Sequence, residues 1–242
     1  TYEAGVAVAP FYTLRRTYHG IPVQMAIMPA DSNKTITYFN KLDTVLEGYL
    51  SCYGPYPFDK IGYSITPFGG GGMEHATCIV IGSALVTTTL TYEYIAYHEL
   101  SHMWFGDMVT CASWHDIWLN EGFASWMAGR ATERLHPEWE TAATAVQSRE
   151  DAMAIDALAT THPIVQHLKS ARDVDEAFDS ITYQKGNAVL RMLETYVGAD
   201  TWRAGVRRYI AAHAYGNTSS DDLWAAVDAV VKNTSLPVIV KG

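Results

Sequence analysis

Two histidines four residues apart, His98 and His102, constrain this chain more than any other feature of its sequence. Residues at this spacing lie on one face of a helix, so both imidazoles can point at a single metal ion. Glu99 would then lie close enough to that ion to handle a water molecule without being a ligand. Eighteen residues separate His102 from Glu121, enough for the chain to turn and return on a second helix with a third ligand.

This set of donors predicts a catalytic zinc site. Two imidazoles and one carboxylate leave the fourth position of a tetrahedral Zn²⁺ open, whereas structural zinc sites use four protein ligands. We therefore expect His98, His102 and Glu121 to bind one Zn²⁺ per chain. The alternative, a helix with two surface histidines and a solvated glutamate, is less favoured because Glu121 and the motifs below agree with the zinc interpretation.

Composition limits the partners of the protein. With 242 residues, 48% of them apolar, the chain can bury a substantial core. Its net charge of −9 argues against nucleic acid, and no apolar run approaches the ~20 residues of a membrane span. Because the chain begins with Thr1, we expect it to be part of a longer protein. Its compartment stays open, with a cytoplasmic location slightly favoured.

The hydrophobic periodicity predicts strands first and helices later. Alternation at Val6 and Val8 and again over 21–27 predicts strands, the second beginning after a turn at His19-Gly20. We interpret residues 1–33 as a strand-rich remnant of a preceding β domain and residues 34–242 as the catalytic domain. Further strands are expected at 61–66 and 77–81. Helices are expected at 34–53, 117–135, 138–155, 181–197, 200–213 and 220–232, besides the one carrying both histidines, from Thr89 or Thr91 to about Phe105.

A run of four glycines, residues 69–72, precedes Met73, Glu74 and His75. A phosphate-binding loop is disfavoured, because no Lys-Ser/Thr follows it. Two interpretations stay open from the residues alone. The run is either a flexible turn beside an ordinary surface glutamate, or a place where another part of the molecule approaches the backbone closely, beside a carboxylate suited to a cationic ligand.

Several motifs together resemble the aminopeptidase N-like family of gluzincin metallopeptidases. The similarity covers about residues 34–235 in the family's order and spacing. The matching pieces are Gly71-Gly72-Met73-Glu74-His75, His98-Glu99-Leu100-Ser101-His102 with Glu121, Trp104-Phe105-Gly106, Asn120-Glu121-Gly122-Phe123-Ala124 and Tyr183-Gln184-Lys185-Gly186.

This resemblance implies an α+β, mostly helical fold: a thermolysin-like metallopeptidase catalytic domain with a small sheet in its N-terminal lobe. It implies a zinc-dependent aminopeptidase that acts on peptides with a free N-terminus. Flanking domains of the full-length protein are the other expected partners, because known members carry a β domain before the catalytic domain and a helical domain after it.

The resemblance also implies a role for each matching residue. Glu99 resembles the general base, and Tyr183 the hydroxyl that stabilises the tetrahedral intermediate. Glu74 matches the carboxylate that binds the substrate's free α-amino group. Its neighbours are expected to help bind substrate; they are Gly71, Gly72, Met73 and His75.

Four positions depart from the family pattern and put substrate preference and metal affinity in doubt more than the reaction. His75 replaces an Asn, Asp107 replaces an Asn, Met103 replaces a Gln, and Ala128 stands where many members have a second Glu. His115 is either a hydrogen-bond partner of a ligand or, as favoured, an ordinary histidine. The rival functions are an inactive binding module, a zinc endopeptidase, and a zinc hydrolase acting on a non-peptide epoxide.

Overall fold

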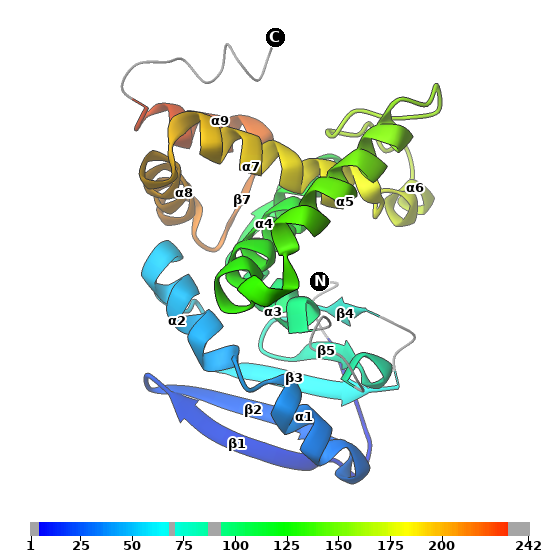
Figure 1. Cartoon of the computed structure of the whole chain (residues 1–242), viewed down its shortest axis with the longest axis vertical. Helices are drawn as coiled ribbons and strands as arrows, with labels where there is room; N and C mark the ends of the chain where they lie inside the picture. The colour runs from blue at the N-terminus through cyan, green and yellow to red at the C-terminus, as the bar shows by residue number, and fades with distance from the viewer. Residues whose placement is uncertain (1–4, 68–70, 87–92, 232–242) are drawn as a thin grey trace.

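The structure, a computed structural model, describes residues 5–67, 71–86 and 93–231 of the chain. Its N-terminal part is a small mixed sheet with helices packed against it, and its C-terminal part is built mainly from helices (Figure 1). The expectation of an α+β, mostly helical fold with a small sheet in the N-terminal lobe is confirmed. None of the helices in the described ranges is long and apolar enough to span a membrane.

The sheet has the strand order β1-β2-β3-β5-β4. Its strands are β1 (Tyr12–Tyr18), β2 (Ile21–Ile27), β3 (Ile61–Thr66), β4 (Gly72–Met73) and β5 (Ile79–Gly82). β1 and β2 form an antiparallel hairpin across the expected turn at His19 and Gly20, whose φ angles of 47° and 82° suit a two-residue hairpin loop. Burial alternates along β2, where Val23, Met25 and Ile27 are buried in the core.

The segment before this hairpin differs from the expectation. Val6 and Val8 are each 92% exposed and belong to no strand, so the strand predicted there is wrong. Two alternating valines carry little apolar surface, and no strand of the described chain pairs with them. β2 runs parallel to β3, with Val23 opposite Ile61, so residues on both sides of position 33 share one sheet. A domain boundary at residue 33 stays a prediction.

The single helix expected at 34–53 is interrupted. It consists of α1 (Ser32–Tyr38) and α2 (Leu42–Tyr53). At the break the backbone N–H of Asn40 donates to the carbonyl of Thr37, a tighter three-residue bond. The break leaves Phe39 fully buried, with its ring centroid 4.5 Å from that of Tyr63 in β3. Packing against the sheet therefore overrides helix continuity here.

Helices dominate the rest of the chain, as the periodicity predicts. They are α3 (Glu93–Ser101), α4 (Trp118–Leu135), α5 (Thr141–Asp156), α6 (Ala171–Glu176), α7 (Gly186–Val197), α8 (Ala199–His213) and α9 (Ser220–Asp228). A π-helical turn, Ile181–Lys185, precedes α7, and β6 (Val109–Cys111) pairs in parallel with β7 (Gly216–Thr218). α3 ends at Ser101 rather than near Phe105, and its expected start at Thr89 or Thr91 lies outside the described residues.

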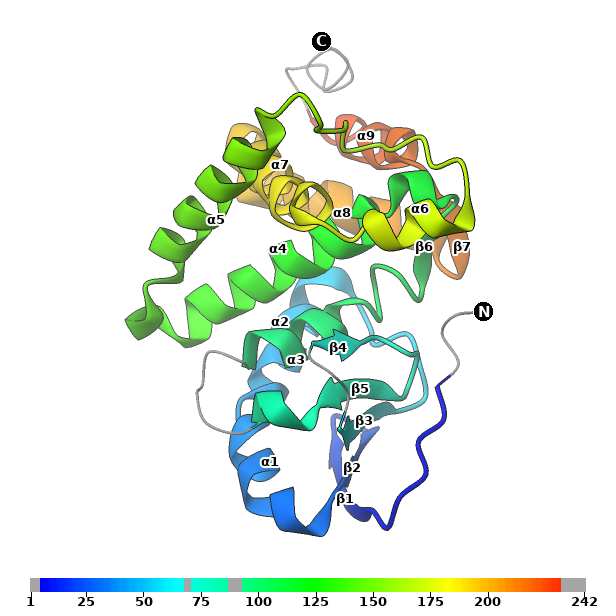
Figure 2. The ribbon, with the colours of Figure 1, turned by 90° about the vertical axis from the view of Figure 1, so that its right-hand side faces the viewer.

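Helix α4 crosses the middle of the molecule (Figures 1 and 2). Trp118, Phe123 and Trp126 of α4 are all buried in the core. Phe123 stacks on Phe105, with centroids 4.2 Å apart and planes 1° from parallel. Since Phe105 lies in the turn after α3, this stack fixes α4 against the segment that follows the two histidines.

Two glycines make a matched test of this packing. A Cβ on Gly205 of α8 would lie 2.8 Å from the Cα of Val227 in α9, whereas a Cβ on Gly48 of α2 would meet no atom within 4 Å. Gly205→Ala should lower the free energy of unfolding by about 1–3 kcal/mol through overpacking. Gly48→Ala should raise it by up to about 1 kcal/mol, because alanine favours the helix. Urea denaturation of both variants measures the difference; equal effects would contradict the close approach of α8 and α9.

Candidate metal centre and active site

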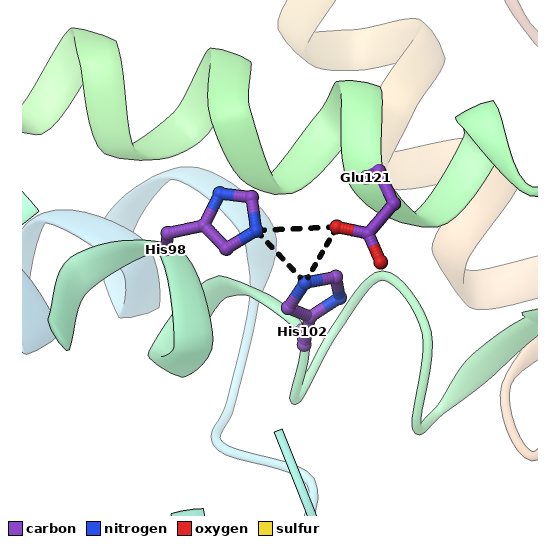
Figure 3. Close-up of side chains that lie close together, drawn as sticks. All are labelled: His98, His102 and Glu121. Carbon is purple, nitrogen blue, oxygen red and sulfur yellow. Dashed lines mark hydrogen bonds and ion pairs between the residues drawn. The ribbon is translucent and has the colours of Figure 1, made fainter. Parts of the chain in front are cut away.

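Helices α3 and α4 bring the three expected metal ligands together. Figure 3 shows His98 and His102 extending from α3 and the turn after it, and Glu121 reaching down from α4. The Nε2 atom of His98 lies 3.1 Å from Nε2 of His102 and 3.2 Å from Oε2 of Glu121. The third distance, from His102 Nε2 to Glu121 Oε2, is 3.4 Å. One histidine from α3, one from the turn directly after it and a carboxylate from α4 therefore converge on one point.

This triangle has the dimensions of a zinc site. Donors at about 2.0–2.1 Å around a tetrahedral ion lie about 3.3–3.4 Å from one another. The three measured separations of 3.1–3.4 Å match that spacing. The donors are two nitrogens and one carboxylate oxygen, a combination that Zn²⁺ accepts in catalytic sites. His98, His102 and Glu121 thus fit a zinc ion, and three protein donors leave a fourth position for another ligand.

The charges around the triangle also favour a cation. Glu74, Glu99 and Glu121 are all buried, each with no more than 6% of its surface exposed. Burial and the neighbouring carboxylates Glu74 and Glu121 raise the pKa of Glu99 well above its ordinary value, against the opposing effect of His102. Burial alone would also raise the pKa of Glu121, but His102 and His98 lower it far below the ordinary value. Three buried carboxylates around two imidazoles form a site that a divalent cation would stabilise.

The early end of α3 orients His102. Its Nδ1 lies 2.9 Å from the carbonyl oxygen of Phe105, so Nδ1–H donates there and Nε2 keeps its lone pair for a metal. Gly106 has φ of +134°, and a Cβ on it would lie 3.0 Å from His102 Nδ1. A helix continued to Phe105 would not allow this carbonyl to turn back toward the ring. Sequence reasoning missed this contact, although Trp104-Phe105-Gly106 marked the segment.

Gly72 brings β4 against Glu99. A Cβ at Gly72 would lie only 2.4 Å from Oε1 of Glu99, so no larger residue fits without moving that carboxylate. Glu74 follows in the same segment, and one oxygen each of Glu74 and Glu99 and one ring nitrogen of His102 all lie within 4.8 Å of one another. The glycine run therefore allows a close approach, and Glu74 is a buried residue of the site rather than a surface glutamate.

The other residues expected to bind substrate lie in or next to β4. Met73 pairs with Val80 of β5. Gly71 has φ of +86°, and its carbonyl accepts the N–H of Gly82. His75 is half-buried, and Gly5 packs so closely on its ring that a Cβ there would lie 2.5 Å away. The structure thus groups these residues beside Glu74, while their part in substrate binding stays a prediction.

Tyr183 lies beside His98, in the π-helical turn before α7. Its ring stacks on that of His98 with centroids 5.9 Å apart. Burial, the charge of Glu121 and a hydrogen bond to that carboxylate raise the pKa of Tyr183 well above its ordinary value, so its hydroxyl stays protonated. Asp179 holds the turn, because its Oδ1 accepts the backbone N–H groups of Ile181 and Thr182.

Two glycines let this turn reach the metal-binding triangle. A Cβ on Gly122, next to Glu121, would lie 3.2 Å from the Cα of Gly186, the first residue of α7. Helices α4 and α7 can therefore approach closely at this point. Both glycines belong to motifs that the sequence singled out, but the contact between them joins segments 64 residues apart and was not foreseen.

Two further sequence expectations concern hydrogen bonds to the ligands. His115 contacts the carbonyl oxygen of Leu168 through Nε2, at 3.3 Å, as an ordinary histidine would. Nδ1 of His98 is buried and has no hydrogen-bond partner in the described part of the chain. Ala128 is fully buried and offers no side-chain acceptor. An effect of Ala128 on metal affinity stays a prediction.

An HExxH helix packed against a second helix that supplies a third metal donor, in a mostly helical α+β fold, defines the class of a metallopeptidase catalytic domain. The Peptidase family M1 domain matches residues 38–241. With the similarities below, this match shows that the chain belongs to peptidase family M1, as the resemblance to aminopeptidase N-like enzymes predicts.

Curated relatives that are named as aminopeptidases or as a protease-interacting factor are similar to this chain over most of its length. Aminopeptidase M1 of Arabidopsis thaliana is 34% identical over 95% of this chain and 27% of its own length. Aminopeptidase 2 of Candida albicans is 31% identical over 99% of the chain and 28% of its own length. Tricorn protease-interacting factor F2 of Thermoplasma volcanium is 38% identical over 75% of the chain and 24% of its own length. The chain spans about a quarter of the length of these relatives.

The metal-binding triangle can be tested without any assay of activity. Glu121→Gln keeps the size of the side chain but removes the negative charge and one good donor. Mutating a residue that only hydrogen-bonds to a metal ligand typically weakens metal binding ~10–100-fold. Because Glu121 is itself a proposed ligand, this variant should weaken Zn²⁺ binding by more than that. Competition with a zinc-chelating dye measures the affinity, and Glu133→Gln on the same helix is the control. Equal affinity for the two variants would contradict the assignment of Glu121.

Proposed function

We propose that this chain is the catalytic domain of a zinc-dependent aminopeptidase, which removes N-terminal residues from peptides. The observation that carries the proposal is the buried carboxylate of Glu74 beside Glu99 and His102, at the edge of a metal-binding triangle. The triangle supports hydrolysis, and Glu74 supports selection of a free amino terminus.

His98, His102 and Glu121 would hold the zinc ion. When bound, zinc acts as a Lewis acid that polarises the scissile carbonyl and lowers the pKa of water toward 7. Glu99 would accept the proton of the attacking water and later donate it to the leaving amine.

Tyr183 would stabilise the negative charge that develops on the carbonyl oxygen. Its protonated hydroxyl is a donor held in place by the turn that Asp179 caps. A donor positioned before the reaction costs no reorganisation during it, and losing one such donor typically slows the reaction ~10²–10³-fold.

Glu74 would make the enzyme an exopeptidase. A buried carboxylate forms a strong, charge-assisted hydrogen bond with the ammonium group of a free N-terminus. A peptide that continues beyond that point would place a neutral amide against the carboxylate, so internal bonds would be poor substrates. This argument disfavours an endopeptidase. The presence of all six groups, His98, Glu99, His102, Glu121, Glu74 and Tyr183, disfavours an inactive binding module.

Peptides with a free N-terminus are the proposed substrates, and flanking domains of a longer protein are the proposed partners. The short share of each relative that the chain matches supports the second point. A zinc hydrolase that acts on an epoxide remains the rival activity, and the substrate tests below separate the two.

Replacing the general base should separate metal binding from turnover. Glu99→Gln keeps the three metal donors intact, so zinc content should remain one ion per chain by elemental analysis. Because a neutral amide cannot accept the proton of water, kcat on an aminoacyl fluorogenic substrate should fall by ~10²–10⁴-fold. Activity near that of the unaltered protein would rule out Glu99 as the base.

Removing the amine-binding carboxylate should affect only substrates with a free amine. Glu74→Ala should lower kcat/KM for unblocked peptides by at least about tenfold, the loss expected for a charged hydrogen bond. N-acetylated peptides should already be poor substrates and should change little. Rates would be followed by chromatography of the released amino acid. If the unaltered protein cleaves blocked and free peptides equally well, the exopeptidase assignment fails.

A further inference from the structure

A cavity of about 350 Å³ lies beside Tyr183, between α4, α5 and the start of α7. This volume is within the ~300–1,000 Å³ range of pockets for small ligands. Its walls include Tyr94, Ser125, Gly129, Tyr183, Asn187 and Arg191. Thr144 and Ser148 of α5 add further hydroxyl groups. Arg191 is the only Lys or Arg side chain among its described lining residues.

The cavity and Glu74 lie at different ends of the proposed active site. Tyr94 and Tyr183, which line the cavity, both have rings about 6 Å from that of His98, at 6.1 and 5.9 Å. Glu74 instead clusters with Glu99 and His102 and does not line the cavity. In Figures 1 and 2, α5 lies on the side of α4 away from the sheet, whereas β4, just before Glu74, belongs to the sheet. A peptide with its amine at Glu74 would therefore extend past the triangle toward the cavity.

Arg191 presents part of its guanidinium group to this cavity. Its Nε donates to Oδ1 of Asn187 at 3.1 Å, and Nη1 donates to Oε1 of Glu133 at 2.6 Å. Nη2 lies over Gly129, where a Cβ would be 2.8 Å away. None of the hydrogen bonds between described residues uses Nη2. Asn187 and Glu133 hold the planar guanidinium group in place and leave its Nη2 atom to donate to a ligand.

No carboxylate in this group pairs with Arg191 alone. Glu133 is shared, because it also accepts a hydrogen bond from Nη1 of Arg130 at 2.9 Å. Arg130 pairs in addition with Glu194. Two guanidinium groups thus face two carboxylates, and Arg130 contacts both of them. Arg191 keeps Nη2 for a further acceptor, and of these four charged side chains it alone is among the described residues that line the cavity.

We propose that this cavity binds the residue on the carboxyl side of the scissile bond, and that Arg191 selects a carboxylate there. The inference rests on the proposed aminopeptidase function and specifies its substrates. A guanidinium group recognises a carboxylate through charge-assisted hydrogen bonds, and the hydroxyls of Ser125, Thr144 and Ser148 suit a polar ligand. The carboxylate comes either from an acidic side chain or from the C-terminus of a dipeptide.

Four substrates distinguish these sources in the purified protein. Leu-Glu-amide and Leu-Gln-amide differ only in a side-chain carboxylate, while Leu-Leu and Leu-Leu-amide differ only in the terminal one. The protein should prefer the charged member of at least one pair by about tenfold in kcat/KM, mainly through a lower KM. The pair that responds identifies the source of the carboxylate.

Variants assign the preference to Arg191. Arg191→Met should bring the ratio within the responding pair close to one, and Arg191→Lys should keep part of it because the charge remains. Arg130→Met is the matched control, since Arg130 pairs with the same Glu133 but does not line the cavity. This variant should keep the ratio.

Three outcomes overturn the inference: equal rates within both pairs for the unaltered protein, an unchanged ratio in Arg191→Met, or an equal loss of the ratio in Arg130→Met. The comparison in the unaltered protein decides the first outcome even if a variant fails to fold. If no unblocked peptide is cleaved at all, the proposed aminopeptidase function fails instead, so the two failures are distinguishable.

Discussion

The contact between Glu121 and the two imidazoles of His98 and His102 is the constraint on which the rest of the structure depends. It joins α3 to α4 through three buried polar groups, each with a donor atom within 3.4 Å of the others. Such groups are costly to bury without a charge to balance them. A divalent cation would supply that charge, while the aromatic stack of Phe105 on Phe123 holds the two segments at the required distance.

Small residues let the other functional groups reach this centre. Gly72 leaves room for the Glu99 side chain against β4, and Gly106 allows the chain to turn next to the His102 ring. Gly122 packs against Gly186, which allows Tyr183 to stack on His98. Each glycine lies within four residues of a proposed functional residue. The site is thus formed by close backbone approaches, and a single methyl group at any of these positions would disturb it.

The sequence was informative where the signal is local. The spacing of His98 and His102 and the periodicity of α4 and β3 predicted the helix that carries His98, the second helix and a strand, all of which the structure contains. Features set by distant contacts were not predictable in this way. The break near Phe39 follows packing on the sheet, and the early end of α3 follows the carbonyl of Phe105. The closeness of Glu74 to Glu99 was expected only from family resemblance, because no local pattern encodes it.

The most direct test of this account is the position of zinc itself. Anomalous diffraction at the zinc edge, from crystals grown with Zn²⁺, locates the ion without any assumption about the reaction. The account predicts one peak per chain, about 2.0–2.1 Å from Nε2 of His98 and of His102 and within coordinating distance of Glu121. A fully occupied zinc ion elsewhere, with the three side chains turned away from one another, would contradict it.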